Sequence, residues 1–235
     1  MTMPNELRAA IADEKATGVT IPPGVYLLDE PLVVGPRMRY LGGHGVILRP
    51  SENFQGGALL RVVGEDLFKK RISEFTLVGM KFVGDDVVTG VLISNTDHFT
   101  ARDCVAFRCG VGIMAVDNWD VLLDNWFSIV CGDGAHITAT DPKMVVNVLR
   151  IVSSTFERST GTGLIIRNSN NVWLTDCKLH GIPNAPTRLA LIDRCNGVRA
   201  RNTLVSQIDG SERIVVTESC GDVKIKGNIE RVLRG

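Results

Sequence analysis

A short strand-like unit recurs along most of the chain, and it limits the possible folds more than any other feature of the sequence. Within Gly161 to Gly181, apolar Val172 and Leu174 alternate with polar or outward residues and are followed by the turn residue Asp176. A fixed period with two-residue alternation is typical of stacked strand repeats. The unit returns every 22 to 28 residues, as Phe75, Leu77 and Gly79; Phe99, Ala101 and Asp103; Val121, Leu123 and Asn125; Leu149, Ile151 and Ser153; Val198, Ala200 and Asn202; and Val223, Ile225 and Gly227.

This repeat predicts a solenoid, because one unit cannot bury its apolar face alone and needs its neighbours to form a core. A parallel sheet built with helical crossovers would need an apolar stripe at helical spacing between the strands, and no such stripe occurs after residue 20. We therefore predict an all-β fold, a right-handed single-stranded parallel β-helix of about seven or eight coils. It should form a single domain over residues 19–235.

The first 18 residues are expected to form a capping α-helix, since an open solenoid end exposes its core and strand edges. Pro4 and Asn5 should begin this helix and Gly18 should end it. Between residues 18 and 50, prolines and glycines divide short apolar runs, which predicts strands around 19–21, 25–28, 32–34, 38–41 and 46–48.

The overall charge excludes two classes of partner. The formal net charge is zero, so no global field favours nucleic acid or a membrane surface. No apolar run reaches the ~18 to 20 residues of a membrane-spanning helix, and the first residues lack the basic and apolar regions of a secretory signal. We expect a protein made in the cytoplasm without a signal peptide.

Six cysteines occupy defined places in the repeat. Cys109 and Cys131, like Cys195 and Cys220, fall at matching positions of adjacent coils, about 4.8 Å apart. A disulfide could span that distance, but side chains in register rarely reach its dihedral angle, so stacked reduced thiols are favoured. No CxxC or Cys/His cluster has zinc spacing, and we expect no structural metal and no cofactor.

Several motifs resemble those of a known superfamily. The opening IPPGVYLLDEPLVV and MRYLGG, within residues 21–43, is similar to the start of pectate-lyase-like β-helix proteins, which include phage tailspikes and many polysaccharide lyases and glycosidases. NVWLTDC at 171–177 and DVLLDNW at 120–126 resemble the repeat of the same superfamily. These motifs belong to the scaffold, so the resemblance implies the fold without specifying a reaction.

One corner of the solenoid collects candidate catalytic residues. The predicted register places a polar group within about two coil spacings, roughly 10 Å. Two carboxylates 5 to 9.5 Å apart can hydrolyse a glycosidic bond, and an exposed Trp can stack on a sugar ring. The competing interpretation is that these side chains hydrogen-bond the turn backbone, as Asp and Asn commonly do. The group consists of Asp97, His98, Asp117, Trp119 and Asp120.

A weaker pair of candidates comes from two short motifs. NTD at 95–97 and GDG at 132–134 are similar to motifs of the polygalacturonase family, but the other parts of that family's signature are not present in recognisable order. We keep Asp133 and His136 as second-rank catalytic candidates.

The outward positions of the central strands predict a ligand-binding face. Like charges stacked directly on one another repel, unless an anion such as a carboxylated or sulfated glycan, or acidic residues of another subunit, lies between them. Arg and Trp side chains suit either partner, and a solvated charged face is the alternative. The residues are Arg150, Trp173, Arg199, Arg201, Lys224 and Lys226, with Trp119 at the corner.

Three kinds of function remain open. The first is a structural and glycan-binding protein similar to a phage tailspike or minor tail protein, located in the virion tail and forming a homo-oligomer, with a trimer favoured. The second is a polysaccharide lyase, glycoside hydrolase or epimerase acting on an acidic glycan. The third is a small-molecule biosynthetic enzyme built on the same scaffold. Short corners, few histidines and a chain that stops directly after its last coil favour the first.

Overall fold

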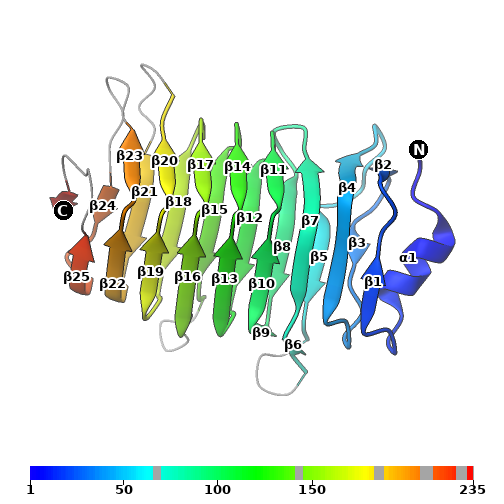
Figure 1. Cartoon of the computed structure of the whole chain (residues 1–235), viewed down its shortest axis with the longest axis horizontal. Coiled ribbons are helices and arrows are strands. Elements are labelled where there is room, and N and C mark those ends of the chain that lie inside the picture. Colours follow the sequence, from blue (N-terminus) through cyan, green and yellow to red (C-terminus); the bar gives the residue numbers. More distant parts are fainter. Residues whose placement is uncertain (66–69, 141–144, 183–187, 207–213, 226–231, 235) are drawn as a thin grey trace.

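The computed structural model is a parallel β-solenoid of about eight turns with one short helix at its N-terminal end (Figure 1). It describes residues 1–65, 70–140, 145–182, 188–206, 214–225 and 232–234. Each regular coil contributes three strands, so the solenoid has three faces. All strand pairs of the described residues join neighbouring coils and run parallel, which confirms the fold class predicted from the repeat.

The first face contains the strands of the sequence repeat. Its order follows the chain, and every strand pairs with its counterpart in the next coil. The strands are β1 (Gly18–Thr20), the first part of β4 (Tyr40–Pro50), the first part of β7 (Thr76–Val83), β10 (Phe99–Arg102), β13 (Asp120–Asp124), β16 (Val148–Val152), β19 (Val172–Thr175), β22 (Asn196–Arg201) and β25 (Gly221–Ile225).

The second face lies beside the first in the front layer of Figure 1, and β4 and β7 run through both. Its strands are β2 (Gly24–Leu28), the second parts of β4 and β7, β11 (Val105–Phe107), β14 (Phe127–Ile129), β17 (Thr155–Glu157), β20 (Lys178–His180) and β23 (Leu204–Ser206).

The third face forms a separate sheet behind the other two. Its strands are β3 (Leu32–Val33), β5 (Ala58–Val63), β8 (Thr89–Ser94), β12 (Val111–Val116), β15 (Asp133–Thr138), β18 (Thr162–Arg167), β21 (Arg188–Asp193), β24 (Ile214–Val216) and β26 (Val232–Arg234). A small extra pair, β6 (Ile72–Ser73) with β9 (Thr96–Asp97), lies at the corner between the third and first faces.

The predicted register is confirmed coil by coil. Val121 is paired with Phe99 on one side and Leu149 on the other. Leu149 is paired in turn with Val172. The turn residues that close the unit adopt left-handed backbone angles, with φ of +54° at Asp103 and +53° at Asp176. Asp, Asn and Gly tolerate this region best, which explains why they recur there.

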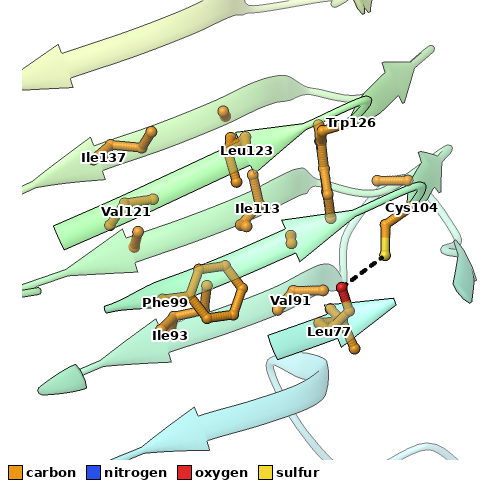
Figure 2. Close-up of a cluster of buried hydrophobic side chains, with 14 of the residues drawn as sticks. Leu77, Val91, Ile93, Phe99, Cys104, Ile113, Val121, Leu123, Trp126 and Ile137 are labelled. Atoms are coloured by element: carbon orange, nitrogen blue, oxygen red, sulfur yellow. Dashed lines mark hydrogen bonds between the residues drawn. The ribbon is translucent and has the colours of Figure 1, made fainter. Parts of the chain in front are cut away.

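The inward side chains of the three faces form one continuous core. Figure 2 shows Phe99, Val121 and Leu123 of the first face opposite Ile113 and Ile137 of the third. At the corner between the first and second faces, Trp126 is fully buried, with its ring 6.5 Å from that of Phe82. Its Nε1 donates a hydrogen bond to Ser128 Oγ at 2.8 Å, so the one polar atom of the indole is satisfied inside the core.

The helix is shorter than the sequence predicts. Helix α1 covers Asn5–Ala12, because Asp13 is extended, with ψ of 126°, and its Oδ1 accepts a hydrogen bond from the Lys15 amide at 2.8 Å. An Asp that bonds the backbone two residues ahead favours a turn over a continued helix. Ile11 is nevertheless fully buried, and its carbonyl accepts a hydrogen bond from the Gly35 amide, so α1 does lie against the first coil.

The strands of the first coils follow the predicted runs with one difference. The runs expected at 38–41 and 46–48 form the single strand β4, which shifts register between Gly42 and Val46.

Among the described residues, α1 is the one helix, and it is far too short to cross a bilayer.

The six cysteines carry free thiols in the structure. Burial raises the pKa of Cys104 to about 12 and that of Cys177 to about 11. These two thiols therefore stay protonated at neutral pH and act as small apolar side chains of the core.

Candidate functional site

A corner between the third and first faces brings together three of the predicted polar residues from two adjacent coils. Asp97 ends β9, His98 forms the turn that follows, and Asp120 begins β13. The imidazole of His98 lies between the two carboxylates: Nδ1 is 2.5 Å from Asp97 Oδ1, and Nε2 is 3.1 Å from Asp120 Oδ2. His98 has a left-handed φ of +54°, and its side chain is 61% exposed. It is thus the member of the group that a ligand could reach.

Asp97 forms an ion pair with an arginine that the sequence analysis did not select. Asp97 is only 7% exposed, and Arg71 Nη2 lies 3.1 Å from its Oδ2. The Arg71 guanidinium also lies 5.1 Å from the ring centroid of Trp119, an exposed residue. Pairing of β6 with β9 places Arg71 beside Asp97. A buried carboxylate needs such a partner to remain charged.

The chemistry open to this corner is acid–base transfer through His98. Both carboxylates are already engaged with the same imidazole, so neither stands free as an independent acid or nucleophile. One ligand atom from each of Asp97, His98 and Asp120 lies within 4.8 Å of the others. A metal ion could use them only if His98 gave up one of its two carboxylate partners, because each ring nitrogen binds one proton or one metal.

Two other predicted catalytic carboxylates hold turns together. The Asp117 carboxylate accepts hydrogen bonds from the Thr140 amide at 2.7 Å and from the Thr140 hydroxyl at 2.8 Å. Asp133 Oδ1 accepts one from the Thr162 amide at 2.7 Å. All three bonds connect adjacent coils. The turn interpretation, which was open for all these residues, therefore has direct contacts to support it here.

His136 lies on β15, in the outer surface of the third face, with apolar neighbours Met114 and Ile165 in the adjacent strands. Burial, and then the nearby Arg167 guanidinium, lowers the pKa of His136. Asp133 and His136 therefore belong to a different face from the His98 corner.

The outward columns of the first face are in the predicted register. Arg150, Trp173, Arg199 and Lys224 are paired in consecutive strands, and Arg201 follows Thr175 in the next column. Trp173 is half-buried, since the Arg150 guanidinium lies 4.8 Å from its ring centroid. Lys226 lies outside the described residues.

A carboxylate of the same chain offsets part of the expected repulsion between the stacked cations of this column. Asp222 forms an ion pair with Arg199, and its Oδ1 lies 3.8 Å from Lys224 Nζ. The hydrogen bond from Arg199 lowers the pKa of Asp222. Arg150 and Arg201 are exposed, and the structure describes no carboxylate paired with either of them. The surface therefore keeps cationic groups on both sides of Trp173.

Comparison with known proteins agrees with this fold over most of the chain. A family model described as a right handed beta helix region matches residues 89–230. Among solved structures, the ORF18 protein of Geobacillus virus E2 is similar with a TM-score of 0.64 and 16% identity, over 88% of this chain and 50% of the viral chain. This chain thus spans about half the length of the viral protein. The A-module of the mannuronan C-5 epimerase AlgE6 from Azotobacter vinelandii gives a TM-score of 0.41 with 14% identity, over 91% of this chain and 82% of the module. Comparison with curated proteins gives no match.

Proposed function

Because this chain belongs to the right-handed β-helix proteins, of the pectate-lyase-like kind, we propose that it is a virion tail component whose first face binds an acidic glycan. The viral source of a similar solved structure supports the virion part of this proposal. A rigid solenoid offers a long, nearly flat surface, which suits an extended polysaccharide chain more than a small molecule.

The observation that carries the proposal is the stacked column of Arg150, Trp173 and Arg199. Three consecutive coils place a guanidinium, an indole and a second guanidinium side by side, at strand spacings of about 4.8 Å. A uronic acid or sulfated sugar needs both chemistries, since its ring has apolar C–H faces and its substituent is an anion. Arg150, which has no carboxylate partner among the described residues, can bind a carboxylate or sulfate through two parallel hydrogen bonds, and Arg199 can do so in exchange for Asp222. The indole can contact the sugar ring.

Alanine at Trp173 or Arg150 is expected to weaken binding of a polygalacturonate oligomer about tenfold, which corresponds to about 1.4 kcal/mol. Isothermal titration calorimetry at low salt measures this directly, and higher salt should weaken binding further. Arg49→Ala is the matched control. Arg49 is an exposed arginine of β4 on the second face of the first coils, so its replacement should leave the affinity unchanged. Equal affinity for a neutral dextran oligomer, or equal losses in all three variants, would refute glycan binding by this face.

The His98 corner supports a second candidate function, an enzyme that transfers protons to or from an acidic glycan. His98 is exposed between two carboxylates, and Trp119 is exposed nearby. Unsaturated uronates or reducing ends released from polygalacturonate or alginate, and lost in His98→Gln, would favour the enzyme over the adhesion protein. Binding without turnover is the result expected from the first proposal.

A further inference from the structure

Both ring nitrogens of His98 face a carboxylate oxygen, and a neutral imidazole cannot satisfy both contacts. Nδ1 faces Asp97 Oδ1, and Nε2 lies 3.1 Å from Asp120 Oδ2. A neutral imidazole has one N–H donor and one nitrogen with a lone pair. That lone pair would point at the lone pairs of a carboxylate and repel them. A cation, either a second proton or a metal ion, must therefore lie between His98 and one of the two carboxylates.

Asp97 determines which ring nitrogen keeps the proton. Its carboxylate is almost fully buried and forms an ion pair with Arg71, so it is fixed in place beside Nδ1. A histidine that binds a metal commonly donates its other N–H to a carboxylate, which sets the tautomer and orients the ring. Nε2, on the side of Asp120, is therefore the nitrogen that remains for a metal ion.

The spacing between Nε2 and Asp120 fits two ligands of one metal ion. Bonds of about 2.0 to 2.2 Å at angles of about 90° to 109° place a nitrogen and an oxygen ligand about 3.0 to 3.4 Å apart. The distance of 3.1 Å from Nε2 to Oδ2 lies in this range. Among the described residues, Asp120 Oδ1 is buried without a hydrogen-bond partner, and coordination through both oxygens would satisfy it.

The charges around the imidazole also favour a cation. Asp97 and Asp120 contact the ring, and the exposed Glu74 occupies the position beside His98 in the preceding coil. Arg71 neutralises one of these three carboxylates. The corner therefore keeps negative charge on the side of His98 that faces Asp120.

We propose that His98 Nε2 and the Asp120 carboxylate bind one divalent transition-metal ion, such as Ni²⁺ or Zn²⁺, with Asp97 as a positioning residue. Water completes the coordination, because the His98 side chain is exposed. Ca²⁺ prefers oxygen ligands alone, whereas an imidazole suits Ni²⁺ and Zn²⁺. The site goes beyond the proposed glycan binding and uses none of its residues, so the two can fail separately.

Isothermal titration calorimetry of the intact protein with NiCl₂ tests the site. We expect one Ni²⁺ per chain, with an affinity that excess Ca²⁺ does not change. Binding should be lost in Asp120→Asn and in His98→Asn, where asparagine tolerates the left-handed backbone of residue 98. Asp97→Asn should keep the site but weaken it about tenfold, because a neutral amide makes the imidazole a poorer ligand.

Two variants serve as matched controls. His44→Asn removes another exposed histidine, one that pairs with no carboxylate in the part of the chain that the structure describes. Cys220→Ser removes the least buried of the six thiols. Both variants should bind Ni²⁺ as tightly as the intact protein does.

Paramagnetic broadening by Ni²⁺ in NMR spectra of the intact protein locates the ion without any substitution. The amide signals of His98 and Asp120 should broaden before those of Arg150 and Trp173. The proposal is overturned if the intact protein binds no Ni²⁺, if Ca²⁺ displaces it, or if broadening is centred elsewhere. Unchanged affinity in Asp120→Asn would equally overturn it, since a lone exposed imidazole would then bind the ion adventitiously. Loss of binding in either control variant would have the same meaning.

Discussion

Trp126→Ala is expected to lower the free energy of unfolding by about 3 to 5 kcal/mol, the range for removing a large buried aromatic side chain. Trp126 is fully buried at the corner of the first and second faces, where its ring stacks on Phe82. The replacement would leave a cavity and would also leave Ser128 Oγ without its indole donor. Urea denaturation followed by far-UV circular dichroism measures the change.

Trp119→Ala provides the comparison, because it removes the same side chain from the surface. Trp119 is 39% exposed and contacts Arg71, so its loss should cost less than about 1 kcal/mol. If the two tryptophan variants lost equal stability, the corner at Trp126 would not be part of the core.

Gly134→Ala should destabilise the protein by about 3 kcal/mol, at the upper end of the range for overpacking, even though it adds a single methyl group. A Cβ at residue 134 would lie 2.2 Å from the carbonyl oxygen of Gly163 in the next coil, and 2.9 Å from a ring carbon of Phe156. The obstacle is backbone held by the strand ladder, so it cannot move aside as the end of a side chain could. Thermal or urea denaturation gives the size of the effect.

Gly57→Ala is the matched control for this substitution. A Cβ at residue 57 would have no atom within 4 Å. Alanine there should be neutral or stabilise by a few tenths of a kcal/mol, because it restricts the unfolded chain. A similar loss at both positions would mean that the close approach of two coils is not what excludes alanine at residue 134.

Most of the fold could be predicted from the sequence, because the determining signals are local and repeated. Alternation within each unit decides which side chains face inward, and Asp, Asn, Ser or Gly at the turn allows the left-handed angle seen at Asn125 and Ser153. The spacing between units then sets which residues become neighbours. This is why the sequence could place His98 beside Asp120 although they are separated by a full coil.

The residues that the sequence analysis missed lie where the repeat is absent or shifted. Arg71 comes from a charged, irregular segment, and its contact with Asp97 depends on the short pairing of β6 with β9. Asp222 lies one position before Val223, and its side chain reaches the neighbouring column to pair with Arg199. Such contacts depend on side-chain reach, which a strand period does not encode.

The end of α1 is a similar case. No proline or glycine interrupts residues 5–17, but Asp13 forms a competing hydrogen bond with its own backbone two residues ahead, and the helix stops at Ala12. The candidate site shows the same competition between local bonding and function. Asp117 and Asp133 use their carboxylates to join coils, whereas the carboxylates of Asp97 and Asp120 hold an exposed imidazole.

The central claim is that residues from separate coils form one binding surface on the first face. An NMR titration of isotope-labelled protein with a polygalacturonate oligomer tests it most directly. The account predicts that amide signals of β16, β19 and β22, around Arg150, Trp173 and Arg199, shift together and fit one dissociation constant, while those of β14 and β17 on the second face do not move. Shifts confined to a single strand, shifts on the second face, or no shifts at all would contradict it.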